Sequence, residues 1–128
     1  MAGAQILVVE DNQKNMKLFR DVLQVKGYRT LEATTGGRAV ELATEHRPDL
    51  VLMDIQLPDI DGVEALSRLR ANERTASIPV LAVTAQAMQG DHERFLAAGF
   101  DDCISKPVNI VELVDTVRKY CDGLGRWL

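Results

Sequence analysis

Short apolar runs alternate along the chain with segments that repeat apolar residues at helical spacing. Runs rich in β-branched and other apolar residues predict strands at 6–9, 28–33, 50–53, 78–83 and 103–105. Helical periodicity follows each run, over 14–26, around Ala39, Val40 and Ala43, around Val63, Leu66 and Leu69, over 88–98, and over 109–121. In the last of these segments, one stripe is predicted to face the core, formed by Ile110, Leu113, Val114, Val117 and Cys121. The run 50–53 is apolar at every position, which is typical of a central parallel strand buried on both faces.

This alternation predicts an α/β fold in which a parallel sheet has helices on both faces. Because crossovers between parallel strands are right-handed, few topologies remain. We expect a flavodoxin-like doubly wound (βα)5 fold with a five-stranded sheet of order 2-1-3-4-5. In that order the winding reverses between the first and third strands, so a ligand is expected at the carboxyl ends of these two strands.

Composition narrows the class of protein. The chain has 128 residues and a formal net charge of −4, which predicts a single domain over 1–128, with a core at about 5–120, a tail at 121–128 and no attached output module. The longest basic run is Arg118-Lys119, so no nucleic-acid surface is expected. No run is long enough to span a membrane, no signal peptide is present, and Cys103 and Cys121 form no disulfide framework, so a cytoplasmic protein is predicted.

Three acidic residues follow the two strands at which a ligand is expected. Glu10 and Asp11 come directly after the run 6–9, and Asp54 comes directly after 50–53. A single acid in such a place is an ordinary loop residue or helix cap, but three that converge on one pocket would repel one another without a cation. Carboxylate oxygens suit Mg²⁺, with Mn²⁺ as an alternative.

The remaining strands end in residues that can bind phosphoryl oxygens. Thr84 and Ala85 end the fourth strand with a hydroxyl and backbone N–H groups, and Lys106 follows the fifth with an ammonium. Taken alone, Thr84 is a strand residue or helix cap and Lys106 a surface lysine, so the prediction depends on their combination. A trans bond before Pro107, starting the last helix, is favoured over a cis bond that would turn Lys106 inward.

The ordered set Glu10-Asp11, Asp54, Thr84-Ala85 and Lys106-Pro107 resembles the receiver domain of two-component response regulators. The resemblance covers about residues 5–120 and includes the loop 53–62, which is similar to the family's phosphorylation loop. It is nearest to single-domain receivers of the DivK-like type and to receivers attached to hybrid kinases.

The resemblance implies a role for each matching residue. Asp54 would be the phosphoacceptor, taking a phosphoryl group from a histidine kinase or a histidine phosphotransfer protein. Mg²⁺ would be ligated by Asp11, by Asp54 and by the backbone carbonyl of Gln56, with Glu10 acting through water. Lys106 and Thr84 would each bind a phosphoryl oxygen, beside Ala85.

It also implies a mode of signalling. The chain would be a monomer or weak dimer that assists only its own phosphorylation and dephosphorylation. A downstream protein would bind the face formed by 88–98, 103–105 and 109–121. One position departs from the family pattern, because Cys103 stands where receivers usually carry a switch Tyr or Phe. We interpret Cys103 as a small buried strand residue, with a redox role as the alternative.

Three alternatives stay open to different degrees. A Mg²⁺-dependent phosphohydrolase could also use Asp54 as nucleophile, but the related enzymes need an acid two residues later, where Gln56 stands. A nucleotide- or flavin-binding module lacks its glycine-rich motif. A receiver that works as an interaction domain without phosphorylation is disfavoured by the complete acidic set.

Other polar residues are given ordinary structural roles. His46 and His92 are predicted to be exposed helix residues, and Asp59 and Asp61 to cap the third helix. The tail with Trp127-Leu128 is interpreted as a loosely packed end, with a docking peptide as the alternative.

Overall fold

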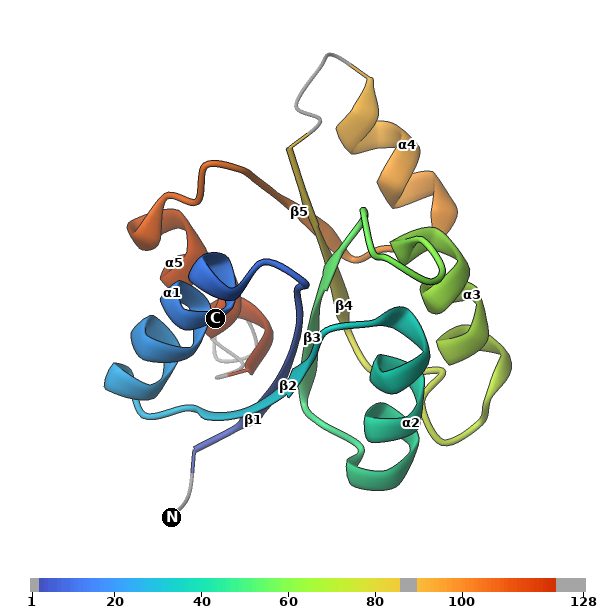
Figure 1. The fold of residues 1–128 in the computed structure, drawn as a ribbon, viewed down its shortest axis with the longest axis horizontal. Coiled ribbons are helices and arrows are strands. Elements are labelled where there is room, and N and C mark those ends of the chain that lie inside the picture. The colour runs from blue at the N-terminus through green and yellow to red at the C-terminus, as the bar shows by residue number, and fades with distance from the viewer. Residues whose placement is uncertain (1–2, 86–89, 122–128) are drawn as a thin grey trace.

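The computed structural model describes residues 3–85 and 90–121 (Figure 1). Its strands are β1 (Gln5–Val9), β2 (Arg29–Ala33), β3 (Leu50–Asp54), β4 (Val80–Thr84) and β5 (Asp102–Ser105). Its helices are α1 (Gln13–Val25), α2 (Gly36–His46), α3 (Gly62–Ala71), α4 (Asp91–Ala98) and α5 (Ile110–Cys121). The predicted elements are all present, and the strand ends differ from the prediction by only one or two residues. The predicted start of the fourth helix, at residue 88, lies outside the described residues.

The strands form one parallel sheet in the order β2-β1-β3-β4-β5. Helices α1 and α5 cover one face of the sheet, and α2, α3 and α4 cover the other (Figure 1). The predicted flavodoxin-like doubly wound fold is therefore confirmed.

Each central strand contributes to two hydrophobic cores, one on each face of the sheet, because successive side chains of a strand point to opposite faces. The core under α1 and α5 contains Ile6, Val8, Leu50, Leu52, Leu81 and Val83. The core under α2, α3 and α4 contains Leu7, Val9, Val51, Met53, Val80 and Ala82. Burial on both faces explains why β3 and β4 are apolar along almost their whole length.

Helix α5 covers the sheet with a shorter apolar stripe than its sequence predicts. Leu113, Val114 and Val117 are buried, whereas Ile110 is 48% exposed. Ile110 is the first residue of the helix, and it lines a surface groove beside Val22 and Val25 of α1 instead of reaching the sheet. Ile110 was therefore wrongly predicted to be a core residue.

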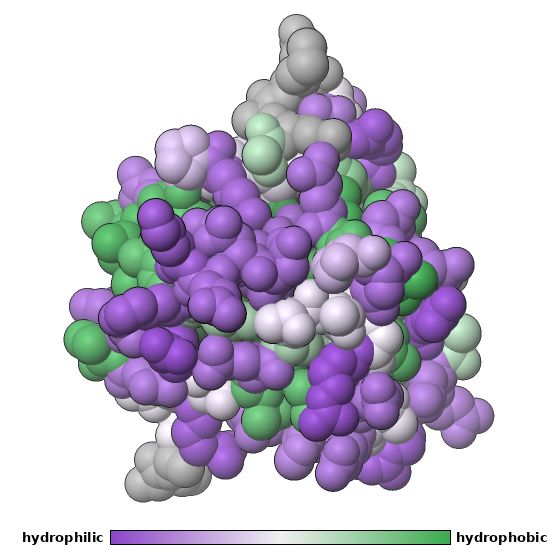
Figure 2. All heavy atoms as spheres, viewed as in Figure 1, coloured by the Kyte–Doolittle hydropathy of each residue, from purple (hydrophilic) through white to green (hydrophobic). Residues whose placement is uncertain are grey.

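The visible surface is mostly hydrophilic, with apolar atoms on the side where α1 and α5 lie (Figure 2). The exposed apolar residues of these two helices are Val25, Ile110 and Val111. In the part of the chain that the structure describes, no helix combines the length and apolar character needed to cross a membrane. The tail that contains Trp127-Leu128 lies outside the described residues.

Candidate functional site

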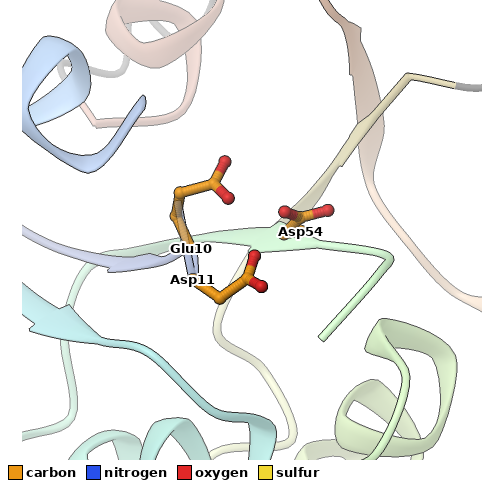
Figure 3. A group of neighbouring side chains, drawn as sticks. All are labelled: Glu10, Asp11 and Asp54. Atoms are coloured by element: carbon orange, nitrogen blue, oxygen red, sulfur yellow. The ribbon is translucent and has the colours of Figure 1, made fainter. Parts of the chain in front are cut away.

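Three carboxylates meet at the carboxyl ends of β1 and β3 (Figure 3). These strands are neighbours with Val9 opposite Met53, so Glu10, which follows β1, and Asp54, the last residue of β3, reach the same edge of the sheet. One oxygen from each of Glu10, Asp11 and Asp54 lies within 4.8 Å of the others. Glu10 and Asp54 are buried, and Asp11 is exposed. The topological switch point thus gathers the acids that the sequence predicts there.

Lys106 brings a positive charge to the same place from the end of β5. Its Nζ lies 3.0 Å from Oδ2 of Asp54 and 2.9 Å from Oε1 of Glu10. Its backbone N–H donates to the carbonyl of Thr84 at 2.8 Å, which ties the start of the β5–α5 connection to the end of β4. The Lys106-Pro107 bond is cis, so the trans bond favoured from the sequence is wrong. Both isomers are accessible before proline, and tertiary contacts that the local sequence does not show decide between them.

The pKa values of the site reflect this crowding. Burial raises the pKa of Glu10 to about 7, and the adjoining Asp54 carboxyl adds to the effect. Burial alone would lower the pKa of Lys106, but its contacts with Glu10 and Asp54 outweigh burial and raise it. Among the described residues, three acidic groups and the Lys106 ammonium thus gather at the site, which leaves negative charge that a cation could neutralise.

The donor set fits a magnesium ion. Oε1 of Glu10 is buried, and within the described residues no donor makes a hydrogen bond of suitable geometry to it, although the Lys106 ammonium lies close by. Asp11 offers a carboxylate from the solvent side. Hard oxygen donors, some buried and some open to water, are the ligands Mg²⁺ takes in proteins. Glu10, Asp11 and Asp54 are the residues that would hold it.

The other predicted site residues lie around this group. The N–H of Gln56, the second residue after β3, donates to Oδ1 of Asp54 at 3.0 Å, so the start of the loop lies directly against that carboxylate. Thr84 is the buried last residue of β4, the strand between β3 and β5, and Ala85 follows it in an exposed position. The roles of Gln56, Thr84 and Ala85 stay predictions, because they concern groups that bind there.

The loop from β3 to α3 is held by a close backbone approach. The N–H of Gly62 donates to the carbonyl of Ile55 at 2.8 Å. A Cβ at Gly62 would lie 2.6 Å from the carbonyl oxygen of Asp54 and 2.9 Å from Cα of Ile55. Only glycine therefore lets helix α3 start this close to the strand end that carries Asp54.

Two aspartates of this loop cap two different helices. Asp61 accepts a hydrogen bond from the N–H of Glu64 at 2.8 Å and caps α3, as predicted. Asp59 was predicted to cap the same helix, and that prediction is wrong. Its carboxylate accepts from Gly36 and Gly37 at the start of α2. The contact spans more than twenty residues of sequence, so no local pattern indicates it.

The remaining candidates occupy less central positions. Cys103 lies on β5 and packs against the core under α2, α3 and α4, but it is only half-buried and so more exposed than predicted, since β5 is an edge strand of the sheet. Burial raises the pKa of its thiol, and the nearby carboxylate of Asp102 raises it further. His46 and His92 have exposed side chains, as predicted.

Comparison with known proteins identifies relatives over nearly the whole chain. The family model of the response regulator receiver domain matches residues 6–118. The polar-differentiation response regulator DivK of Brucella anthropi is 47% identical over 115 residues, which make up 90% of this chain and 94% of that protein. The DivK protein of Brucella ovis matches with the same identity and coverage.

Solved structures share the same architecture. The receiver domain of the sensor histidine kinase PA1611 from Pseudomonas aeruginosa has a TM-score of 0.86 and 39% identity, with 93% of this chain and 98% of that chain covered. In that structure a magnesium ion is coordinated in the active-site cleft. A putative response regulator from Chloroflexus aurantiacus has a TM-score of 0.87 and 30% identity, with 92% and 97% covered.

Proposed function

The chain belongs to the response regulator receiver domain family, and we propose that it accepts a phosphoryl group on Asp54. The donor in this proposal is the phosphohistidine of a sensor histidine kinase or of a histidine phosphotransfer protein. An oxygen of the Asp54 carboxylate attacks phosphorus, the phosphorus–nitrogen bond breaks, and the imidazole leaves. The product is an acyl phosphate on Asp54.

One observation carries this proposal. A buried Asp54 shares its surroundings with two further acids and with the Lys106 ammonium, at 3.0 Å from Oδ2. Phosphoryl transfer needs mainly positioning and neutralisation of charge, and this arrangement supplies both. A nucleophilic carboxylate, cation ligands and a fixed ammonium in one pocket match that requirement better than they match a simple interaction surface.

Each residue has a distinct part in the proposal. Asp11, Asp54 and the carbonyl of Gln56 hold Mg²⁺, or Mn²⁺ in its place, and Glu10 acts through water. When bound, the ion neutralises charge on the phosphoryl oxygens. Lys106 pairs with one phosphoryl oxygen after transfer.

Two further groups at the end of β4 complete the phosphoryl site. The hydroxyl of Thr84 donates to another phosphoryl oxygen, and the N–H of Ala85 lies at the same rim.

Signalling in this proposal follows from the charge that arrives. Phosphorylation adds up to about two negative charges beside the Lys106 ammonium, which then exchanges its contact with Glu10 for one with the phosphoryl group. The end of β4 closes on the phosphoryl group and changes the face formed by α4, β5 and α5, where a downstream protein binds. The protein would signal in the cytoplasm as a monomer or weak dimer, with Cys103 in place of the switch aromatic.

An intact-mass measurement tests the proposal. The protein is incubated with a small acyl-phosphate donor, with Mg²⁺ or with excess EDTA, beside the Asp54→Asn and Asp11→Asn variants. We expect one added phosphoryl group on the wild type with Mg²⁺ and none with EDTA or in Asp54→Asn. Asp11→Asn should need more Mg²⁺. Repeated hydrolysis of phosphate esters without modified protein would support a phosphohydrolase, and binding of a partner unaffected by Asp54→Asn would support a phosphorylation-independent interaction domain.

A further inference from the structure

Asp59 ties the loop after Asp54 to a neighbouring helix. Its Oδ1 accepts from the N–H of Gly36 at 2.8 Å and its Oδ2 from the N–H of Gly37 at 2.9 Å. The first N–H groups of a helix have no partner within the helix, and the helix dipole favours a negative charge there. Thr35 caps the next N–H, that of Arg38, so Asp59 completes the cap of α2 from another part of the chain.

Close packing supports the hydrogen bonds. A Cβ at Gly36 would lie 2.5 Å from Cγ1 of Ile60, so the start of α2 and the loop touch directly at this glycine. Ile60 and Leu57 of the loop pack against the core under α2, α3 and α4. The N–H groups of Gly37 and Gly36 lower the pKa of Asp59 to about 2, because both hydrogen bonds favour the charged carboxylate. We call the contacts of Asp59 and Ile60 with Gly36 and Gly37 the loop latch.

The loop latch lies on the segment that carries one of the proposed magnesium ligands. Gln56 lies near the start of the loop and its N–H donates to Asp54, while the hydrogen bond from Gly62 to Ile55 closes the loop at its base. Asp59 stands between these points and attaches the loop to α2. A loop held at its base and at its middle has fewer conformations to lose when its backbone binds an ion.

We propose that Asp59 is a positioning residue that, through the loop latch, holds Gln56 in place for magnesium binding at the Asp54 site. The inference rests on the proposed function, because it takes the Gln56 carbonyl as a ligand. Asp59 itself does not touch the ion or the phosphoryl group. It acts by keeping the loop in the conformation that the ion requires.

Coupling of this kind works in both directions. If the loop latch favours magnesium binding, magnesium must favour the loop latch by the same factor. Mg²⁺ should therefore slow hydrogen exchange of the Gly36 and Gly37 N–H groups, although both lie on α2 and neither belongs to the proposed ion site. A purely structural cap of α2 would show no such response.

The test measures magnesium affinity without phosphorylation. Mg²⁺ is titrated into ¹⁵N-labelled wild type, Asp59→Ala and Asp59→Asn, and the dissociation constant is taken from NMR shifts. The matched control is Asp49→Ala, since Asp49 is likewise exposed and accepts a backbone N–H, that of Gln5 at 2.8 Å, before β3 begins. We expect Asp59→Ala to bind Mg²⁺ roughly three- to tenfold more weakly, Asp59→Asn to be intermediate and Asp49→Ala to match the wild type.

The outcomes separate this inference from the proposed function. If the wild type binds Mg²⁺ and Asp59→Ala folds but binds it equally well, the inference is overturned and the proposed function stands. Unchanged exchange of the Gly36 and Gly37 N–H groups on addition of Mg²⁺ would overturn it too. If the wild type binds no Mg²⁺, the proposed metal site itself fails, and the inference fails with it.

Discussion

Substitution of Gly62 by alanine tests how closely helix α3 approaches the end of β3, the strand that carries Asp54. The new methyl group would meet the carbonyl oxygen of Asp54 at 2.6 Å and Cα of Ile55 at 2.9 Å. Both distances are shorter than van der Waals contact, and both atoms belong to the backbone, so no rotamer change can relieve them. The loop must move away from the strand end, which disturbs Asp54 and the Gly62–Ile55 hydrogen bond together.

The expected cost can be bounded. Overpacking of this kind costs about 1–3 kcal/mol, while alanine in place of glycine lowers unfolded-chain entropy and returns about 0.4–1 kcal/mol. We therefore expect a net loss of about 1–2 kcal/mol in the free energy of unfolding, or roughly 4–8 °C in Tm for a chain of this size. Phosphorylation from an acyl-phosphate donor should slow as well, because the strand end that moves carries Asp54.

Urea unfolding and thermal melts measure the loss, and Gly37→Ala is the matched control. Gly37 also lies in the first turn of a helix, but its Cβ would meet only the tip of the Asp59 side chain, at 3.2 Å. We expect this control to change stability much less than Gly62→Ala does. If Gly62→Ala is as stable as the wild type or more stable, the backbone has room for a Cβ there and the predicted clash does not exist.

Three further predictions concern charges in and near the site. Lys106→Met removes the ammonium from beside Glu10 and should lower the free energy of unfolding in EDTA by about 1–3 kcal/mol. It should also tighten Mg²⁺ binding, because a repelling positive charge is gone. Unfolding and NMR titrations measure the two effects, and weaker Mg²⁺ binding would contradict the prediction. In a Cys121→Ser background, the rate of Cys103 alkylation should rise with pH, and the midpoint of this rise should lie above that of a free thiol. The reason is that burial and nearby carboxylates raise the pKa of Cys103. A midpoint at or below the free-thiol value would exclude this effect. The pKa of Asp59 is lowered to about 2, so its charge adds stability above its ordinary pKa of 3.8, and this stability is lost as the pH falls through 2. The free energies of unfolding of Asp59→Asn and wild type should therefore differ at pH 6 and converge near pH 2. A difference that persists at the lowest pH would count against the cap.

The sequence predicts the fold well because the signals are local and agree with one another. The uninterrupted apolar character of Leu50–Met53 predicts a strand covered on both faces, and β3 lies at the centre of the sheet. The strand order then determines which acidic residues meet at the site. Once the first and third strands are neighbours, Glu10 and Asp54 must come together at their carboxyl ends, whatever the intervening helices contain.

What the sequence does not reveal depends on contacts between distant segments. Asp59 caps α2 and not the helix that follows it, because the loop folds back over the start of α2. The Gly36-Gly37 pair indicates that another segment packs closely against the start of α2, but it does not indicate which segment this is. Ile110 fits the helical spacing of apolar residues in α5 and is still exposed, because this spacing does not show which part of the helix lies over the sheet. The isomer before Pro107 is set in the same way by tertiary contacts.

Direct mapping of the modified residue tests whether Asp54 accepts the phosphoryl group. The wild type is incubated with Mg²⁺ and a small acyl-phosphate donor, the acyl phosphate is reduced with borohydride, and the product is digested for peptide mass spectrometry. We expect one reduced residue, at Asp54, and none when Mg²⁺ is removed. Modification at Glu10, at Asp11 or outside the site, or no modification of protein that binds Mg²⁺, would contradict it.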